Sequence, residues 1–241
     1  MKILISLFLS VFLNAQSNLL VKYKMTTLFD GSKNYNSELL FSENASVFEF
    51  KLTEKDAIDK EYNDQNNILK VEIPDKSIHK LFFDIDKATI SEIKKKINSE
   101  SQVLVIDSLE LPIWKITIEK RKINNHECIK ALTSFKGRDY EVWFTMDFPT
   151  FFGPWKLNGL PGLILEAHDN KNEVFFEAIE IISTDKSLAS LPTNLEITSS
   201  KDYNKKLTEY LTEITDRLNS LGDRNSKINS KATISKGIEL E

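Results

Sequence analysis

The stretch 127–144 reads ECIKALTSFKGRDYEVWF, which is typical of a β-hairpin. Its two halves, 127–135 and 140–144, are rich in aliphatic and aromatic residues, and the tetrapeptide Lys136-Gly137-Arg138-Asp139 separates them. Short apolar runs that are bounded by such turn residues are characteristic of strands. Two strands joined by so short a turn pair antiparallel. The stretch therefore predicts an antiparallel unit, and the flanking sequence determines how large a sheet it joins.

The same signal extends in both directions from this hairpin, over residues 18 to about 183. The clearest alternation lies at 114–119, where Trp114, Ile116 and Ile118 share one face and polar residues the other. About ten short strands with close connections favour antiparallel pairing, and strand twist curls a sheet of that size. We therefore predict a mainly β fold with a large curved antiparallel sheet, either open or closed into a barrel. The expected strands are a first segment that begins at residue 18, then 38–42, 46–51, 68–73, 79–85, 102–107, 114–119, 127–135, 140–144, 163–168 and 174–182.

Helical signals are confined to two segments. Residues 89–98 place isoleucines at spacings of three and four beside a lysine run, which indicates either a short helix or a solvated loop. Beyond Pro192 a stripe of apolar residues at spacings of four and three predicts a C-terminal amphipathic helix that ends at Gly222 and lies against or beside the sheet. The residues of the stripe are Leu207, Leu211, Ile214, Leu218 and Leu221.

The N-terminus indicates export. Lys2 precedes an apolar run of eleven residues, 3–13, and Ala15 follows, as in a secretory signal peptide. That run is too short to span a bilayer, which takes about 20 residues, so we expect no transmembrane anchor in the mature chain. The expected division is a signal peptide at 1–15, a β-rich domain at 16–192, a helical segment at 193–222 and a polar tail at 223–241. The expected location is the periplasm or cell envelope.

The charge of the chain argues against a nucleic-acid-binding protein, and its cysteine content excludes an internal disulfide. The chain carries 32 Lys and Arg against 36 Asp and Glu, a net charge of −4, whereas nucleic-acid binders show a basic excess. Cys128 is the only cysteine, so an internal disulfide cannot form. We interpret Cys128 as a small half-buried apolar residue rather than a reactive thiol.

The segment 148–162 is the compositional outlier of the chain, because Pro, Gly and large aromatic residues crowd into it. The tetrapeptide Leu160-Pro161-Gly162-Leu163 predicts a type II turn with positive φ at Gly162, and Gly159 offers another positive-φ point. Two interpretations stay open: a rigid plug that covers one end of the sheet, or an aromatic-walled groove that binds a ligand or a partner chain. The aromatic residues of the hypothetical groove are Trp143, Phe148, Phe151, Phe152 and Trp155.

The hexapeptide at 159–164, GLPGLI, resembles the signature after which the GLPGLI family of exported Bacteroidota proteins is named. The block at 141–169 is similar to the rest of that family's pattern, with Trp143, Trp155 and Glu166 in place. The resemblance implies an exported protein. It implies no catalytic residues, because that family has no established activity.

Motifs of the common hydrolases, zinc sites and phosphate-binding loops are missing from the sequence, so we expect no cofactor. Glu166, His168 and Asp169 form the one conceivable metal corner, with no visible further ligand. The favoured function is a non-catalytic ligand-binding or docking protein of the cell envelope. Its partner would be a small apolar ligand or an envelope protein such as an outer-membrane transporter. The alternative is a metal-assisted or hydrolytic periplasmic enzyme around His168.

Overall fold

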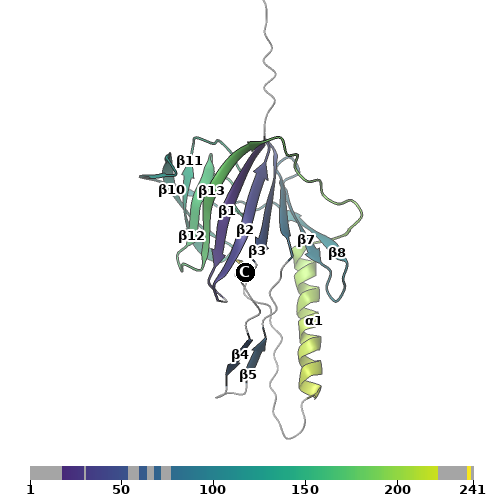
Figure 1. The fold of residues 1–241 in the computed structure, drawn as a ribbon. Helices are drawn as coiled ribbons and strands as arrows, with labels where there is room; N and C mark the ends of the chain where they lie inside the picture. The colour runs from purple at the N-terminus through teal and green to yellow at the C-terminus, as the bar shows by residue number, and fades with distance from the viewer. Residues whose placement is uncertain are drawn as a thin grey trace, which may run out of the picture.

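The computed structural model describes residues 18–29, 31–53, 60–63, 68–71, 77–221 and 238–239. The fold is mainly β, and its core element is a sheet of twelve strands with one C-terminal helix beside it, as predicted (Figure 1). The signal peptide expected at 1–15, and the tail expected at 223–241 apart from residues 238–239, lie outside the described residues. The strands of the main sheet are β1 (Asn18–Thr27), β2 (Lys33–Phe41), β3 (Ala45–Leu52), β6 (His79–Asp84), β7 (Thr89–Lys95), β8 (Gln102–Ser108), β9 (Lys115–Ile123), β10 (His126–Phe135), β11 (Arg138–Thr145), β12 (Leu163–Asp169), β13 (Val174–Thr184) and β14 (Glu196–Thr198).

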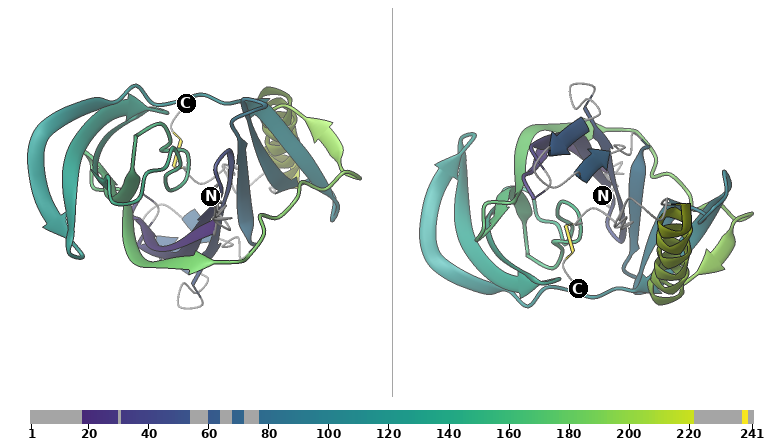
Figure 2. Two further views of the ribbon diagram at one scale, coloured as in Figure 1. Left: turned by 90° about the horizontal axis from the view of Figure 1, so that it is seen from above. Right: turned by 90° about the horizontal axis from the view of Figure 1, so that it is seen from below.

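The sheet is open. Its order is β14-β8-β7-β6-β3-β2-β1-β13-β12-β11-β10-β9, and β14 and β9 stand at opposite ends. Every neighbouring pair is antiparallel except β14 with β8. Two further strands, β4 (Lys60–Asn63) and β5 (Ile68–Val71), pair as a separate ribbon. Seen from above, the half of the sheet that consists of β1, β13, β12, β11, β10 and β9 curls around a coiled segment of the chain (Figure 2). We call the inner side of this curve the concave face and the other side the outer face.

The hairpin at 127–144 is confirmed, with a tighter turn than expected. Phe135 of β10 pairs directly with Arg138 of β11, so the loop consists of Lys136 and Gly137 alone. Both have positive φ, 50° and 75°, which is the geometry of a type I′ turn. This turn matches the right-handed twist of the strands it joins, which explains why two residues are enough.

The segment 148–162 fills the curve of the sheet as the plug that one interpretation predicted. Phe152 and Leu157 are buried in one core with Tyr140 of β11 and Phe41 of β2, and the Phe41 and Phe152 ring centroids lie 6.3 Å apart. Because the segment has no regular strand or helix, its backbone is satisfied by local bonds, such as that from Gly159 N to Phe151 O at 2.8 Å. The segment thus supplies the apolar layer that an open curved sheet needs on its concave side.

The type II turn at Gly162 is wrong. Gly159 has the expected positive φ of 97°, but Gly162 lies outside the left-handed region. A Cβ atom at Gly162 would come within 2.2 Å of the Thr145 carbonyl oxygen. Glycine is therefore needed there because two backbone segments approach closely, and not because of its freedom in φ.

The helix or loop expected at 89–98 is also wrong, because residues 89–95 form β7. This strand pairs with β6 on one side and β8 on the other, as in the pairs Phe83↔Ile90 and Ile93↔Leu104. The isoleucine spacing suggested a helix locally. Hydrogen bonding to two neighbouring strands outweighs that local preference.

Helix α1 (Ser200–Leu221) is present, as predicted, and lies beside the sheet rather than flat against it. Its anchored end is the first turn, where the Ser200 amide donates to Asp107 at 3.0 Å and the Tyr203 hydroxyl donates to the Lys95 carbonyl at 2.9 Å. None of the residues 200–220 is buried, and the helix extends beyond the ends of β7 and β8 (Figure 1). Its apolar stripe is therefore not part of the core described here.

Candidate functional site

The five aromatic residues proposed to line one groove lie in different places. Phe152 and Trp155 are 2% and 3% exposed within the core on the concave side, so they cannot form the wall of an open groove. Phe148 and Phe151 are half-buried and pack against the same core. Trp143 projects from the other face of β11. The aromatic-walled groove predicted from sequence is therefore not formed.

The orientation of β11 follows from its neighbours. The Tyr140 ring lies 6.2 Å from the Trp155 ring, on the concave side. Because successive strand residues point to opposite faces, Asp139, Glu141 and Trp143 project from the outer face. His168 of β12 is the register partner of Glu141 and lies on that same face.

Trp143 lies beneath charged side chains on the outer face. The Arg121 guanidinium is 4.3 Å from its ring centroid and the Lys130 ammonium 5.9 Å, both within the range of cation–π attraction. Arg121 also pairs with Glu166, and Lys130 with Glu141 at 2.8 Å. Trp143 is 8% exposed, so its indole orders these charges rather than contacting solvent.

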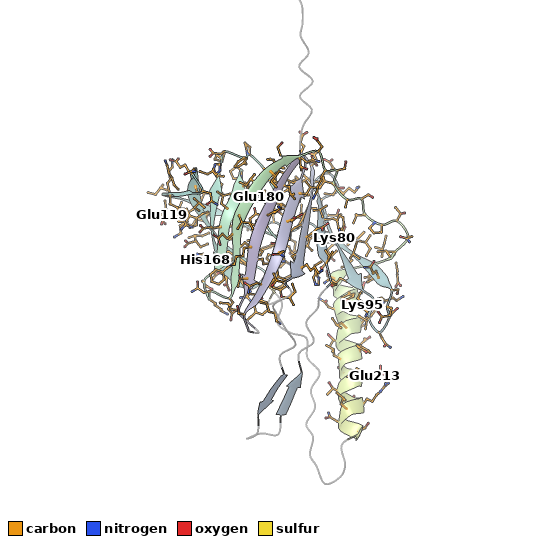
Figure 3. All side chains as sticks on the ribbon, in the orientation of Figure 1. Lys80, Lys95, Glu119, His168, Glu180 and Glu213 are labelled. Carbon is orange, nitrogen blue, oxygen red and sulfur yellow. The ribbon has the colours of Figure 1, made fainter. Side chains whose placement is uncertain are left out.

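Beside this cluster lies an open depression of about 460 Å³, which we call the outer-face groove. Its apolar part is formed by Ile113 and Leu132, and its polar part by hydrogen-bonding side chains of β10, β11 and β12. Figure 3 shows His168 and Glu119, of the edge strand β9, on the side of the molecule away from α1. The residues that line the groove are Ile113, Lys115, Leu132, Thr133, Ser134, Asp139, Tyr140, Glu141, His168 and Asn170.

Two small networks fix the polar side chains of the groove. Asp139 accepts hydrogen bonds from the Ser134 hydroxyl at 2.5 Å and the Asn170 amide at 3.0 Å. Glu141 accepts from Lys130 and from the Trp143 indole at 3.2 Å, and its Oε1 lies 3.8 Å from His168 Nε2. The groove is thus preorganised, with an apolar patch beside carboxylate, amide and imidazole groups.

The Glu141 carboxyl is held in its ionised form. Burial raises its pKa, but the hydrogen bonds from Lys130 and Trp143 outweigh burial, so the net pKa lies below its ordinary value. A carboxyl with a lowered pKa is a poor general acid at neutral pH. The arrangement favours hydrogen bonding to a ligand over proton transfer.

The three residues of the conceivable metal corner do not converge. Glu166 and His168 lie on the outer face, and Glu166 pairs with Arg121. Asp169 points to the concave side, where it pairs with Arg138. Across the part of the chain that the structure describes, no group of three or more His, Cys, Asp or Glu side chains could hold a metal ion. Cys128 is fully buried, and burial raises the pKa of its thiol to about 11, in keeping with an unreactive core residue.

Sequence reasoning missed most of the groove, including Ile113, Leu132, Asp139 and Asn170. Only His168, and Glu166 and Trp143 in the adjacent cluster, had been singled out. The missing information is register: Glu141↔His168 and Trp143↔Glu166 are cross-strand pairs between residues more than 20 positions apart. The alternation in 140–144 could have placed Glu141 on one face, but not opposite His168.

Comparisons with known proteins give one family and a shared fold. A family model described as N-glycanase peptide, N-terminal domain, matches residues 33–210. Two structures of PNGF-II, in space groups C2 and P21, superpose with TM-scores of 0.56 and 0.54 at 17% and 18% identity. Each superposition covers 81% of this chain but only 33% and 34% of PNGF-II, so this chain spans about a third of that protein's length.

A third structure, an uncharacterized conserved protein from Thermus thermophilus, has a TM-score of 0.42 at 9% identity, over 77% of this chain and 92% of that one. No curated protein matches the chain. The GLPGLI relationship stays a prediction, since the matching model is a different one. No helix among the described residues is long and apolar enough to cross a membrane.

Proposed function

Because the chain belongs to the family of the N-glycanase peptide, N-terminal domain, we propose that it is a non-catalytic binding domain whose outer-face groove holds a carbohydrate. The proposal keeps the exported, envelope-associated location and the GLPGLI relationship inferred from the sequence. The family name refers to enzymes that act on glycans. The solved PNGF-II structures share the fold of this chain over about a third of their length. We therefore infer the class of ligand from the family name, and we infer the location of the site from the groove.

The observation that carries the proposal is the composition of the groove. A sugar ring presents a C–H surface beside several hydroxyl groups, and a site for it needs an apolar patch next to fixed hydrogen-bonding groups. Ile113 and Leu132 supply the patch. Asp139, Glu141 and Asn170 supply acceptors and a donor that hydrogen bonds already hold in place. Preorganised groups cost little conformational entropy when a ligand binds.

The test is calorimetric titration of the whole chain with a free N-glycan. We expect saturable binding that Ile113→Ala and Asn170→Ala each weaken about tenfold, since each removes one contact worth roughly 1.4 kcal/mol. Ile118→Ala is the matched control, because Ile118 is 97% exposed on the same strand region but does not line the groove. Absence of glycan binding by the unmodified chain would refute the proposal.

The same preparation separates binding from the hydrolytic alternative. We expect an N-glycosylated peptide to bind without change of mass after prolonged incubation. Release of glycan, lost in the Glu141→Gln variant, would favour the enzyme instead. Binding without release of glycan by the unmodified chain, as well as by Glu141→Gln, would support the binding domain.

A further inference from the structure

Two residues from near the end of the sequence lie inside the curve of the sheet. Figure 2 shows residues 238–239 (yellow) on the concave side, next to the coil formed by the plug segment. The Ile238 side chain packs against the core, and its carbonyl oxygen accepts a hydrogen bond from Arg138 Nε at 2.7 Å. The Glu239 carboxylate pairs with Lys156. Three contacts of different kinds therefore hold two consecutive residues.

The wall of this site is built from buried polar groups. The Arg138 side chain is fully buried, with Nη1 held by Asp169 at 2.6 Å and by Glu173 at 2.7 Å, and its guanidinium lies 5.3 Å from the Phe29 ring. Arg138 is thus fixed so that Nε faces the Ile238 carbonyl. Such a fixed, desolvated donor binds a backbone carbonyl with little loss of side-chain entropy.

The site also has hydrogen-bonding capacity that residues 238–239 do not use. Arg138 Nη2 and the Tyr140 hydroxyl are buried and have no hydrogen-bond partner among the described residues. Buried donors without a partner are rare in folded proteins and are costly to maintain. Both atoms belong to the wall of the site, and neither bonds to residues 238–239.

The charges of the site define its ligand. Without Glu239, the two cations Arg138 and Lys156 balance the two anions Asp169 and Glu173, and both anions already pair with Arg138. Lys156 is the cation that remains for a ligand, and it stands beside the apolar Trp155 ring at 5.9 Å. The ligand needs a carbonyl for Arg138, an apolar side chain for the core and a carboxylate for Lys156.

We propose that the concave face carries a peptide-binding site for a segment in which an apolar residue precedes an acidic one, and that residues Ile238 and Glu239 occupy this site in cis. A segment of the same chemistry from another chain would compete with them. Arg138 and Lys156, which hold residues 238–239, do not line the outer-face groove, although Tyr140 borders both sites. The peptide-binding site does not depend on the carbohydrate proposal.

The test uses the whole chain and a fluorescein-labelled peptide with the sequence of residues 234–241, ISKGIELE, followed by fluorescence anisotropy. The unmodified chain should bind it weakly, since residues 238–239 occupy the site. The double variant Ile238→Ala/Glu239→Ala weakens that occupant and should bind the peptide at least tenfold more tightly. A peptide with lysine in place of the first glutamate, ISKGIKLE, should not bind this variant.

Exchanging the charges of residue 156 and of the peptide gives a second test, which does not depend on one variant alone. Lys156→Glu added to the double variant should abolish binding of ISKGIELE and create binding of ISKGIKLE. Lys120→Glu is the matched control, because Lys120 pairs with Glu127 away from the site and should leave both affinities unchanged. Equal affinity of the unmodified chain and the double variant, or equal binding of both peptides, would overturn the proposal.

Discussion

Arg138 and Asp169 form an ion pair in which both side chains are fully buried, with 2.6 Å between Nη1 and Oδ2. The Asp169 carboxylate also accepts the backbone amides of Glu173 at 2.7 Å and Val174 at 2.9 Å. One side chain therefore ties β11 to the turn between β12 and β13. The same pair fixes Arg138 for its contact with Ile238.

Replacing Asp169 should be strongly destabilising. In Asp169→Asn the Arg138 guanidinium stays buried but loses the charged carboxylate that pairs with it. Breaking such a pair costs about 3–5 kcal/mol. Urea unfolding measures the loss. Glu213→Gln, in the exposed i, i+4 pair with Arg217, is the control and should change the stability by less than about 1 kcal/mol. Similar values for the two variants would contradict the structural role of the buried pair.

Trp155 should behave as a core residue. Trp155→Ala removes a side chain that is 3% exposed and contacts the rings of Phe135 and Tyr140, so it should cost about 3–5 kcal/mol of unfolding free energy. Ile118→Ala should stay within about 0.5 kcal/mol of the unmodified chain, because Ile118 is exposed. A Trp155→Ala protein of unchanged stability would reopen the aromatic groove as a binding site. Thermal or urea unfolding decides the matter.

Gly162→Ala should cost about 1–3 kcal/mol through steric overlap, because the new methyl group meets the Thr145 carbonyl oxygen. Pro161→Ala at the neighbouring exposed position is the control, with an expected effect below about 1 kcal/mol. Calorimetric melting of both variants provides the measurement. If Gly162→Ala were as stable as Pro161→Ala, close backbone approach would not be the reason for glycine at this position.

Because of Glu141, the free energy of unfolding should depend on pH in the acidic range. Its folded pKa is lowered from the ordinary value of 4.5, so its contribution is fully present above that pH and is lost as the pH falls through the lower folded value. The difference in melting temperature between the unmodified chain and Glu141→Gln should therefore shrink as the pH is lowered from 6 to 3. Lys130→Met should reproduce part of this effect, since Lys130 lowers that pKa. A difference that stays constant over this range would contradict the assignment.

The sequence by itself determined the local units of this protein. The turn residues at 136–139 dictate a hairpin, because glycine and the polar residues beside it readily adopt turn conformations. The Pro- and Gly-rich composition of 148–162 excludes a regular element, and the spacing of Leu207, Leu211 and Ile214 specifies the helix. Each of these features depends on residues a few positions apart, whose backbone preferences act within the unfolded chain as well.

Only the tertiary structure decided which residues meet. Glu141 faces His168 through strand register, whereas Asp169 turns to the concave side and pairs with Arg138. Residues 89–95 became a strand because β6 and β8 were available on both sides. Gly162 is required by Thr145, which belongs to another segment of the chain. Such contacts depend on long-range pairing and on the space left in the packed core, and no pattern of neighbouring residues encodes either.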